Sequence, residues 1–180
     1  TKSIELDPQH FLSYYNRGNN KYALEDYQGA ITDYNKAIEI DPQNAYIYYD
    51  RGLAKDRLRD YQGAIADYSK AIEINPQYAF AYNSRGAVKN DLGEYQRAIA
   101  DFNRAIEINP QYAFAYDGRG SAKNGLGDHQ GAIADYSKAI EINPQFAFAY
   151  NNRGSAKYNL KDYQGAIADY SKAIEIDPQH

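Results

Sequence analysis

The sequence GAIADYSKAIEI occupies residues 63–74 and returns unchanged at residues 131–142 and 165–176. Six prolines recur along the chain at a constant interval of 34 residues. They are Pro8, Pro42, Pro76, Pro110, Pro144 and Pro178. A fixed period of this length is typical of repeat architectures, in which each copy forms one supersecondary unit. The chain is therefore predicted to be an array of similar units rather than one irregular domain.

The repeats are counted from the third residue after each proline, which gives five full copies of 34 residues. Their boundaries are 11–44, 45–78, 79–112, 113–146 and 147–180. Residues 1–10 match positions 25–34 of the repeat, so we expect them to form the truncated second helix of a preceding copy. Methionine is absent even at position 1, so we expect the sequence to be a processed or excised fragment.

Each copy is expected to fold as two helices. In the last copy, apolar residues at helical spacing predict a first helix over about residues 147–160. Asp162 is a suitable N-cap for a second helix with a broad apolar face. That face is expected to carry Ala166, Ile167, Tyr170, Ala173 and Ile174. This helix should end at Asp177, because Pro178 forces the residue before it out of the helical region. No stretch alternates between apolar and polar residues, so no strand is predicted.

A single helix pair exposes its apolar face, whereas copies stacked side by side bury a continuous core. The recurring residues of one copy are Tyr82, Gly86, Leu92, Tyr95, Ala98, Phe102, Ala105 and Pro110. With the 34-residue period, this pattern resembles the tetratricopeptide repeat (TPR) family over residues 11–180. The resemblance implies an all-α, right-handed superhelix of antiparallel helix pairs whose first helices line a concave groove. It also implies a non-catalytic scaffold that binds peptides or proteins.

Small residues are repeated where helices are expected to meet. Position 8 of the repeat is glycine in every copy, and positions 20 and 27 are always alanine. Glycine inside a helix costs about 1 kcal/mol relative to alanine, so its repetition indicates a packing requirement. We interpret these columns as structural residues that allow two helices to approach closely.

Two columns of cations in the first helices are matched by one column of aspartates in the second helices. The arginines at position 7 are Arg17, Arg51, Arg85, Arg119 and Arg153. The lysines at position 11 are Lys21, Lys55, Lys89, Lys123 and Lys157, and the aspartates at position 23 are Asp33, Asp67, Asp101, Asp135 and Asp169. Because an unpaired buried charge costs several kcal/mol, each arginine is predicted to pair with an aspartate of its own or an adjacent copy. The alternative is a basic stripe that binds phosphate or RNA.

The resemblance places positions 2, 5, 9, 12 and 13 of the first helices in the groove. The candidate peptide-binding residues are Tyr15, Tyr46, Tyr49, Phe80, Asn83, Asn90, Phe114, Asp117, Asn124, Phe148, Asn151 and Tyr158. Aromatic rings supply anchoring area, and amides both donate to and accept from a peptide backbone. The alternative is that the position-2 rings merely pack between copies.

The charges expected in the groove favour a neutral or basic protein or peptide partner. The charged residues at positions 5, 6, 12 and 13 are Asp50, Asp56, Asp91, Asp117 and Arg57, which sum to minus three. TPR domains that bind the acidic tails of chaperones use Lys and Arg at positions 2, 5 and 6 of a clamp. Positions 2 and 5 contain no Lys or Arg in this chain. The clamp also uses Asn at positions 6 and 9, and only Asn16, Asn19 and Asn152 match it. An acidic tail is therefore not expected as the ligand.

Several function classes are disfavoured by composition. The formal net charge of −4 argues against binding nucleic acid or an anionic membrane. The apolar runs are too short to span a bilayer, so a soluble protein is expected; the compartment is left open, with the cytoplasm favoured. The chain has no cysteine, and its three histidines fall outside metal-ligand or nucleophile–base spacings. We therefore expect no metal, no cofactor and no enzymatic activity.

Two further expectations concern the context of the array. The chain could be an adaptor or regulatory region excised from a larger multidomain enzyme, or, as a weaker alternative, a nucleic-acid-binding helical repeat. The last copy is not followed by a polar capping helix, so Ile167, Tyr170 and Ile174 are expected to lack a neighbour. End-to-end self-association through uncapped terminal repeats is the predicted consequence.

Overall fold

The computed structural model describes residues 10–178, and this part of the chain contains ten α-helices and no strand. The helices are α2 (Phe11–Ala23), α3 (Tyr27–Ile40), α4 (Ala45–Arg57), α5 (Tyr61–Ile74), α6 (Ala79–Asp91), α7 (Tyr95–Ile108), α8 (Ala113–Gly125), α9 (His129–Ile142), α10 (Ala147–Asn159) and α11 (Tyr163–Ile176). The all-α prediction is confirmed for these residues. The helix expected within residues 1–10 lies outside them.

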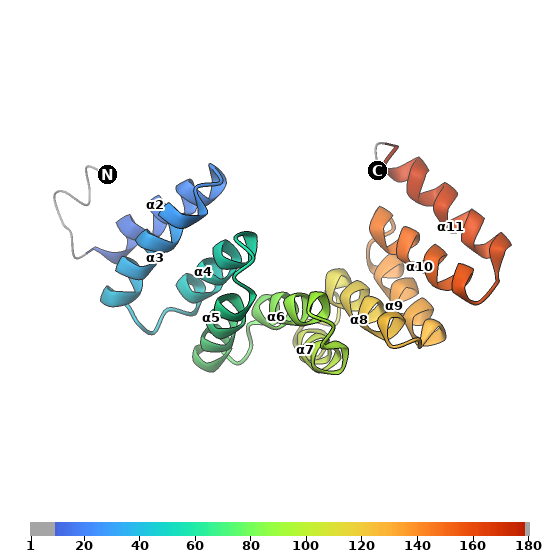
Figure 1. Cartoon of the computed structure of the whole chain (residues 1–180), viewed down its shortest axis with the longest axis horizontal. Coiled ribbons are helices and arrows are strands. Elements are labelled where there is room, and N and C mark those ends of the chain that lie inside the picture. Colours follow the sequence, from blue (N-terminus) through green and yellow to red (C-terminus); the bar gives the residue numbers. More distant parts are fainter. Residues whose placement is uncertain (1–9, 179–180) are drawn as a thin grey trace. The chain divides into compact units, whose positions relative to one another are not determined.

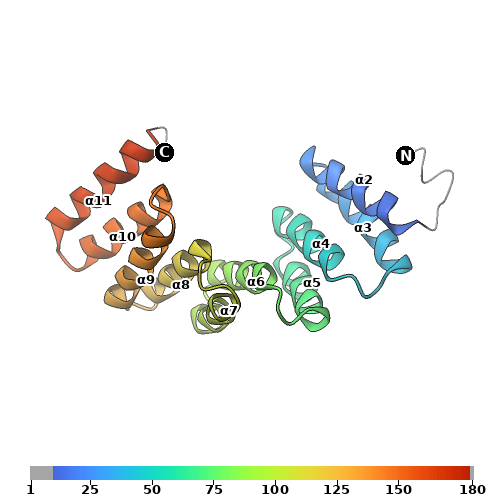
Figure 2. The same cartoon turned by 180° about the vertical axis from the view of Figure 1, so that it is seen from behind.

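The chain divides into two compact units, with the boundary inside α6 between Val88 and Lys89. In the first unit, α2 packs on α3 and α4 packs on α5, while α3 also contacts α4. In the second unit, the pairs are α8 with α9 and α10 with α11, and α7 and α9 contact the following first helix. Both views show the two helices of each pair side by side (Figure 1, Figure 2). Each of these four pairs therefore packs within its own unit, and in both units a second helix also contacts the first helix that follows it.

Aspartate caps fix the start of most second helices. Asp162 accepts a hydrogen bond from the backbone N–H of Gly165 at 3.0 Å, which confirms the predicted N-cap of α11. The same contact is made by Asp26, Asp60 and Asp128 in α3, α5 and α9. In the third copy, Glu94 makes no such cap and instead pairs with Arg97. At the other end, α11 stops at Ile176 and Asp177 is its C-cap, as predicted from Pro178.

The turn between the two helices requires a left-handed backbone at position 15. Gly93 and Gly127 meet this requirement with φ of 75° and 83°, respectively. Glu25, Arg59 and Lys161 occupy the same place with φ of 61–66°, although side chains disfavour that conformation. The amide of the next residue closes the turn, as where Asp60 N–H donates to the carbonyl of Lys55 at 2.9 Å. Because the residue at position 15 varies between copies, the sequence alone does not predict this shared conformation.

The repeated glycines admit a buried ring from the partner helix. A Cβ atom added to Gly52 would lie 2.7 Å from the ring of Tyr68, which is itself fully buried. Equivalent approaches of 2.6–2.9 Å occur at Gly18, Gly120 and Gly154. Alanines at positions 20 and 27 are buried in every copy. The predicted close approach is thus confirmed, and the atoms that need the space belong to the aromatic residue at position 24.

The predicted arginine–aspartate pairs form inside single copies. Arg51 Nε donates to Asp67 Oδ2 at 2.9 Å, and its Nη2 donates to the other carboxylate oxygen at 2.5 Å. Lys55 Nζ adds a contact of 2.7 Å to the same aspartate. The same arrangement joins Arg17, Arg119 and Arg153 to Asp33, Asp135 and Asp169. Two cations therefore neutralise each of these carboxylates, none of which is more than 5 % exposed. Arg85 and Asp101 lie in different units.

The same arginines also join neighbouring copies, which the sequence did not predict. The Nη1 atom of Arg51 donates to Asn35 Oδ1 in the preceding copy at 2.6 Å. Arg85, Arg119 and Arg153 make the corresponding bond to Ser69, Asn103 and Ser137. Each guanidinium also lies over the tyrosine three residues before it, as Arg51 does over Tyr48 at 5.4 Å. One side chain therefore connects its own second helix to the second helix of the copy before.

These contacts stabilise the ionised aspartate. Burial alone would raise the pKa of Asp33, but hydrogen bonds from Arg17 and Lys21 outweigh burial and lower that pKa. The pKa of Asp169 is lowered for the same reasons by Arg153 and Lys157. The resulting stabilisation is present above the unfolded pKa of about 3.9 and is lost as the pH falls through the folded pKa.

Replacing Arg51 by leucine is expected to lower the free energy of unfolding by about 2–4 kcal/mol, because Asp67 would keep only one cation and Asn35 would lose its donor. Urea denaturation followed by circular dichroism measures this change. The control is Lys70→Ala, which removes a pair with Glu73 whose side chains are 36 % and 70 % exposed. The control should change stability by less than about 0.5 kcal/mol. Equal urea midpoints for the two variants would contradict the role given to Arg51.

Candidate functional site

Exposed aromatic rings occupy position 2 of two first helices in the first unit, α4 and α6. Tyr46 on α4 is 57 % exposed and Phe80 on α6 is 52 % exposed. Tyr78, in the loop before α6, lies between them, with ring centroids 5.3 Å from Tyr46 and 6.3 Å from Phe80. Tyr78 also contacts Tyr49 at 5.0 Å. The position-34 ring thus fills the space between copies, and the position-2 rings remain open to solvent.

The second unit has the same arrangement with phenylalanines. Phe114 on α8 and Phe148 on α10 are 57 % and 51 % exposed, while Phe146 between them is 7 % exposed. The Phe146 centroid lies 4.8 Å from Phe114 and 6.5 Å from Phe148. The ring at position 34 therefore packs between copies, whereas the rings at position 2 are more than half exposed. The sequence reasoning missed the position-34 rings, although they form a column of Tyr78, Tyr112 and Phe146.

Polar side chains bridge successive first helices through positions 5 and 6. Tyr15 donates its hydroxyl hydrogen to Asp50 Oδ2 at 2.5 Å, and the hydroxyls of Tyr49 and Ser84 lie 3.4 Å apart. In the second unit, Asn152 Nδ2 donates to Asp117 Oδ1 at 3.0 Å. The carboxylate is at position 6 in the first unit and at position 5 in the second. Each bridge links residues 35 apart in sequence, so it forms only when the copies stack.

The two bridging carboxylates differ electrostatically from those of the second helices. Burial raises the pKa of Asp50, and the hydrogen bond from Tyr15 opposes this only in part. Burial likewise raises the pKa of Asp117 against the bond from Asn152. Burial, followed by the contact with Asp50, raises the pKa of Tyr15 to about 12. Within residues 10–178, neither Asp50 nor Asp117 forms a salt bridge. Each of the two carboxylates accepts its side-chain hydrogen bond from a neutral residue, Tyr15 or Asn152.

The remaining predicted residues lie in less uniform settings. Asn83 and Asn90 on α6 each have a buried amide oxygen without a hydrogen-bond partner, and Asn90 Nδ2 reaches Ser121 at 3.4 Å. Asn124 Oδ1 contacts Nδ1 of His129 at 2.6 Å, which explains the position of that histidine. Asn151 is exposed. Tyr158 is 58 % exposed and packs edge-on against Tyr163. The twelve residues are thus divided between the two units.

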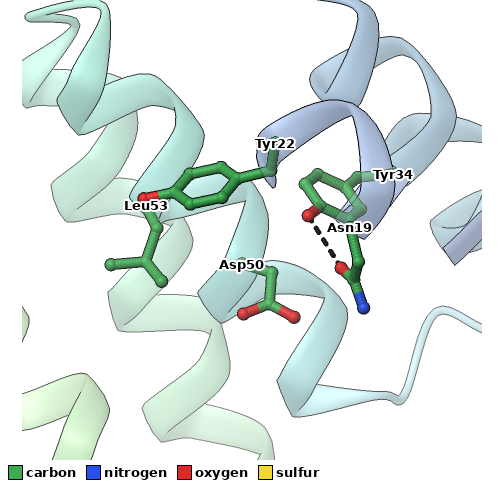
Figure 3. Close-up of a pocket in the computed structure, with 5 residues that line it drawn as sticks. All are labelled: Asn19, Tyr22, Tyr34, Asp50 and Leu53. Carbon is green, nitrogen blue, oxygen red and sulfur yellow. Dashed lines mark hydrogen bonds between the residues drawn. The ribbon is translucent and has the colours of Figure 1, made fainter. Parts of the chain in front are cut away.

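A pocket opens beside Asp50 in the first unit and has a volume of about 220 Å³. It is lined by Asn19 and Tyr22 of α2, Tyr34 of α3, and Asp50 and Leu53 of α4. Figure 3 shows the three residues of the first copy facing the two residues of α4. Tyr34 donates its hydroxyl hydrogen to Asn19 Oδ1 at 2.8 Å. The sequence reasoning counted Asp50 only as a charge, although Asp50 is the one carboxylate in its column.

Each helix within residues 10–178 is too short or too polar to cross a bilayer. In the same range, no cluster of three or more histidine, aspartate or glutamate side chains is arranged to hold a metal ion.

Family models match most of the chain. A model described as tetratricopeptide repeat matches residues 45–78, 79–112 and 147–180. A second model, described as TPR repeat, matches residues 18–58 and 120–161. A search among curated proteins found no match.

Solved structures share the arrangement of helices. A crystal structure of the MamA protein is 30 % identical, with 94 % of this chain and 92 % of that chain covered and a TM-score of 0.80. YrrB, a TPR protein described as having an unusual peptide-binding site, is 26 % identical, with 100 % and 93 % covered and a TM-score of 0.77. MamA from Desulfovibrio magneticus RS-1 is 20 % identical over 94 % of this chain and 96 % of that chain. Its TM-score of 0.84 supports the fold alone.

Replacing either bridging carboxylate by asparagine is expected to raise the free energy of unfolding at pH 7 by about 1 kcal/mol. In Asp50→Asn and Asp117→Asn the side-chain oxygen still accepts its hydrogen bond, but no charge is desolvated. Because the folded pKa is raised, the folded chain holds the proton to higher pH than the unfolded chain. Stability therefore falls as the pH rises from about 4 through the folded pKa, and the gain from asparagine should vanish below about pH 4.

Urea midpoints at stepped pH measure this effect. The other titratable groups that interact with these carboxylates are Tyr15, Tyr34, Tyr49, Tyr78 and Tyr136, whose pKa values are all raised. They remain protonated in the acid window. Asp33→Asn supplies the contrast, because the pKa of Asp33 is lowered and this variant should lose stability at pH 7. If Asp50→Asn and Asp117→Asn also lose stability there, the assignment of unpaired carboxylates is wrong.

Proposed function

Because the chain belongs to the tetratricopeptide repeat family, we propose that it is a non-catalytic scaffold that binds a peptide segment of a partner protein. The binding site is a groove lined by the first helices. One observation carries the proposal: α4, α6, α8 and α10 each keep a large ring more than half exposed at position 2, while the ring at position 34 packs between copies. Aromatic area of this kind typically anchors partners. The peptide-binding site named for YrrB is consistent with this function.

The polar groups beside the rings suit a peptide of neutral or basic character. Asparagines at positions 5 and 12 offer both donors and acceptors to a backbone, so binding through them depends little on ligand sequence. Asp50 and Asp117 add negative charge that no cation of residues 10–178 neutralises through a salt bridge. Desolvating two rings contributes roughly 3–6 kcal/mol before ordering costs, which gives an affinity on the order of micromolar for a short peptide.

The pairing of the cations weakens the nucleic-acid alternative. All five lysines at position 11 contact an aspartate at position 23, at 2.7–2.9 Å. Cations held in this way would have to break buried pairs to contact phosphates, which costs several kcal/mol each. The adaptor alternative is compatible with the proposal, since a peptide-binding array serves the same role inside a larger enzyme.

A second proposal concerns self-association through α11. Ile167 and Ile174 on this helix are 58 % and 61 % exposed, whereas the equivalent Ile133 and Ile140 of α9 pack against the next copy. Tyr170, which was also expected to lack a neighbour, instead lies over Gly154 of its own pair.

The corresponding surface of α2 is unsuitable as a partner for α11. It carries Ser13 and Asn20 where α4 buries Ile47 and Ala54. Stacking α11 of one chain on α2 of another would therefore place the apolar side chains of α11 against polar side chains. We propose that two copies associate through their α11 faces, related by a twofold axis.

Changing Phe80 and Phe114 together to alanine is expected to weaken peptide binding at least tenfold, because each unit loses one exposed anchor. The ligand for this measurement is a synthetic peptide selected from a randomised library against the parent chain, and fluorescence anisotropy gives the affinity. The control double variant, Leu24→Ala with Leu58→Ala, removes two apolar side chains that are 80 % and 46 % exposed outside the groove positions. Unchanged affinity in the Phe80 and Phe114 variant, with helicity intact, would show that the groove is not the site.

Replacing Ile167 and Ile174 together by lysine should abolish concentration-dependent dimerisation, because like charges would face each other across the twofold axis. Analytical ultracentrifugation over a wide range of protein concentrations measures the equilibrium. The control variant Leu12→Lys alters an apolar residue of α2 that is 42 % exposed. A parent chain that stays monomeric at the highest concentration would defeat this second proposal without affecting peptide binding.

A further inference from the structure

We propose that the pocket lined by α2, α3 and α4 binds the cationic side chain of a lysine or arginine in the partner peptide, with Asp50 as its counter-ion. The inference rests on the proposed peptide-binding function and adds a specific recognition element to it. It assigns one pocket in the first unit to one residue class of the ligand.

The pocket has room for a long side chain. Its volume of about 220 Å³ is several times the roughly 30 Å³ that one water molecule occupies in the liquid. Residues of two successive copies form its walls, with Asn19, Tyr22 and Tyr34 on one side and Asp50 and Leu53 on the other (Figure 3). The site therefore exists only where the first two copies are stacked.

The charge of the pocket is unbalanced. Tyr15 donates to Oδ2 of Asp50, and no described residue forms a hydrogen bond with Oδ1 or a salt bridge with this carboxylate. By contrast, Asp67 on the next helix of the same unit is contacted by both Arg51 and Lys55. A partly buried carboxylate that lacks a cation is costly in the free protein, and a cation arriving with the ligand removes that cost. The chain thus retains at Asp50 an unpaired charge of the kind that it neutralises in the second helices.

The other lining residues suit the stem and head of a basic side chain. Lysine and arginine carry three or four methylene groups, which pack well against the Tyr22 and Tyr34 rings and the Leu53 side chain. The faces of tyrosine rings attract a cation. Asn19 Oδ1 already accepts from Tyr34 and has a second lone pair for an N–H of the ligand. An ammonium or guanidinium could therefore meet acceptors from two copies at once.

One cation of the chain itself lies at the edge of the pocket. Arg57 of α4 is exposed, and its Nε donates to the hydroxyl oxygen of Tyr22 at 3.3 Å. Its charge opposes the entry of a second cation, so removing it should strengthen ligand binding. Arg57→Gln keeps a donor for Tyr22 and therefore tests the charge alone.

The corresponding place in the second unit lacks the carboxylate. The equivalents of the lining residues there are Ser121, Asn124, Tyr136, Asn152 and Ser155. Asn152 stands where Asp50 stands, and it donates to Asp117 on the preceding first helix. Asp117→Asn is therefore a matched control, since it removes a bridging carboxylate of similar burial from outside the proposed pocket.

A double-mutant cycle between protein and ligand tests the proposal. Peptides are selected from a library of random nine-residue peptides against the full chain, and each basic residue of the selected peptides is replaced by norleucine or citrulline. We expect one position at which this replacement weakens binding to the parent about tenfold or more. The same replacement should change binding to Asp50→Asn less than about twofold, because the charge partner is already gone. Norleucine and citrulline also show whether lysine or arginine is preferred.

The control variants and the peptide selection test the pocket and the scaffold function separately. The same basic residue should remain important with Asp117→Asn, and Arg57→Gln should bind the parent peptide more tightly. Selected peptides that lack a basic residue, or whose basic residues do not couple to Asp50, would overturn the pocket and leave the scaffold function standing. Failure to select any peptide would overturn both. Because Asp50→Asn is expected to stabilise the chain, a circular dichroism melt separates loss of coupling from loss of fold.

Discussion

The arginine at position 7 is the side chain on which the stacking of copies depends. Its guanidinium fork pairs with the aspartate of its own second helix, donates to the second helix of the preceding copy, and lies over a tyrosine of its own helix. Desolvation makes an unpaired charge at this place costly, so the arginine needs its partners in place when the copies stack. Apolar burial alone would hold the helices together with less positional definition, because it is non-directional.

Charge is used differently in the two layers of helices. Four aspartates of the second helices are buried and contacted by two cations each, namely Asp33, Asp67, Asp135 and Asp169. In Asp33 and Asp169 this lowers the carboxyl pKa. Asp50 and Asp117 of the first helices are bridged only by a neutral tyrosine or asparagine, and burial raises their pKa values. Structural carboxylates thus contribute to stability in the free protein, whereas the bridging carboxylates reduce it. A cost of this kind is typical of residues that are completed by a ligand.

Aromatic residues show the same division between packing and exposure. Rings at position 24 fill the space above the glycines, and rings at position 34 fill the space between copies. Because the rings at positions 24 and 34 already fill both of those spaces, the rings at position 2 remain exposed. Much of the candidate surface was predictable, because position 2 was identified from the family resemblance. The role of Phe146 and Tyr78 was not, since a ring in a loop has no periodic signal that separates packing from exposure.

The sequence by itself determined the helices, their ends and the pairing partners of most charges, because these depend on local propensity, on Pro178 and its equivalents, and on a strict 34-residue period. Only the tertiary structure decided that Glu25, Arg59 and Lys161 adopt the left-handed turn, that Tyr170 packs within its own pair, and that Asp50 borders a pocket. The bridge from Tyr15 to Asp50 shows the reason. It joins position 5 of one copy to position 6 of the next, and such a contact is set by the rotation between stacked copies, which a repeating sequence does not specify.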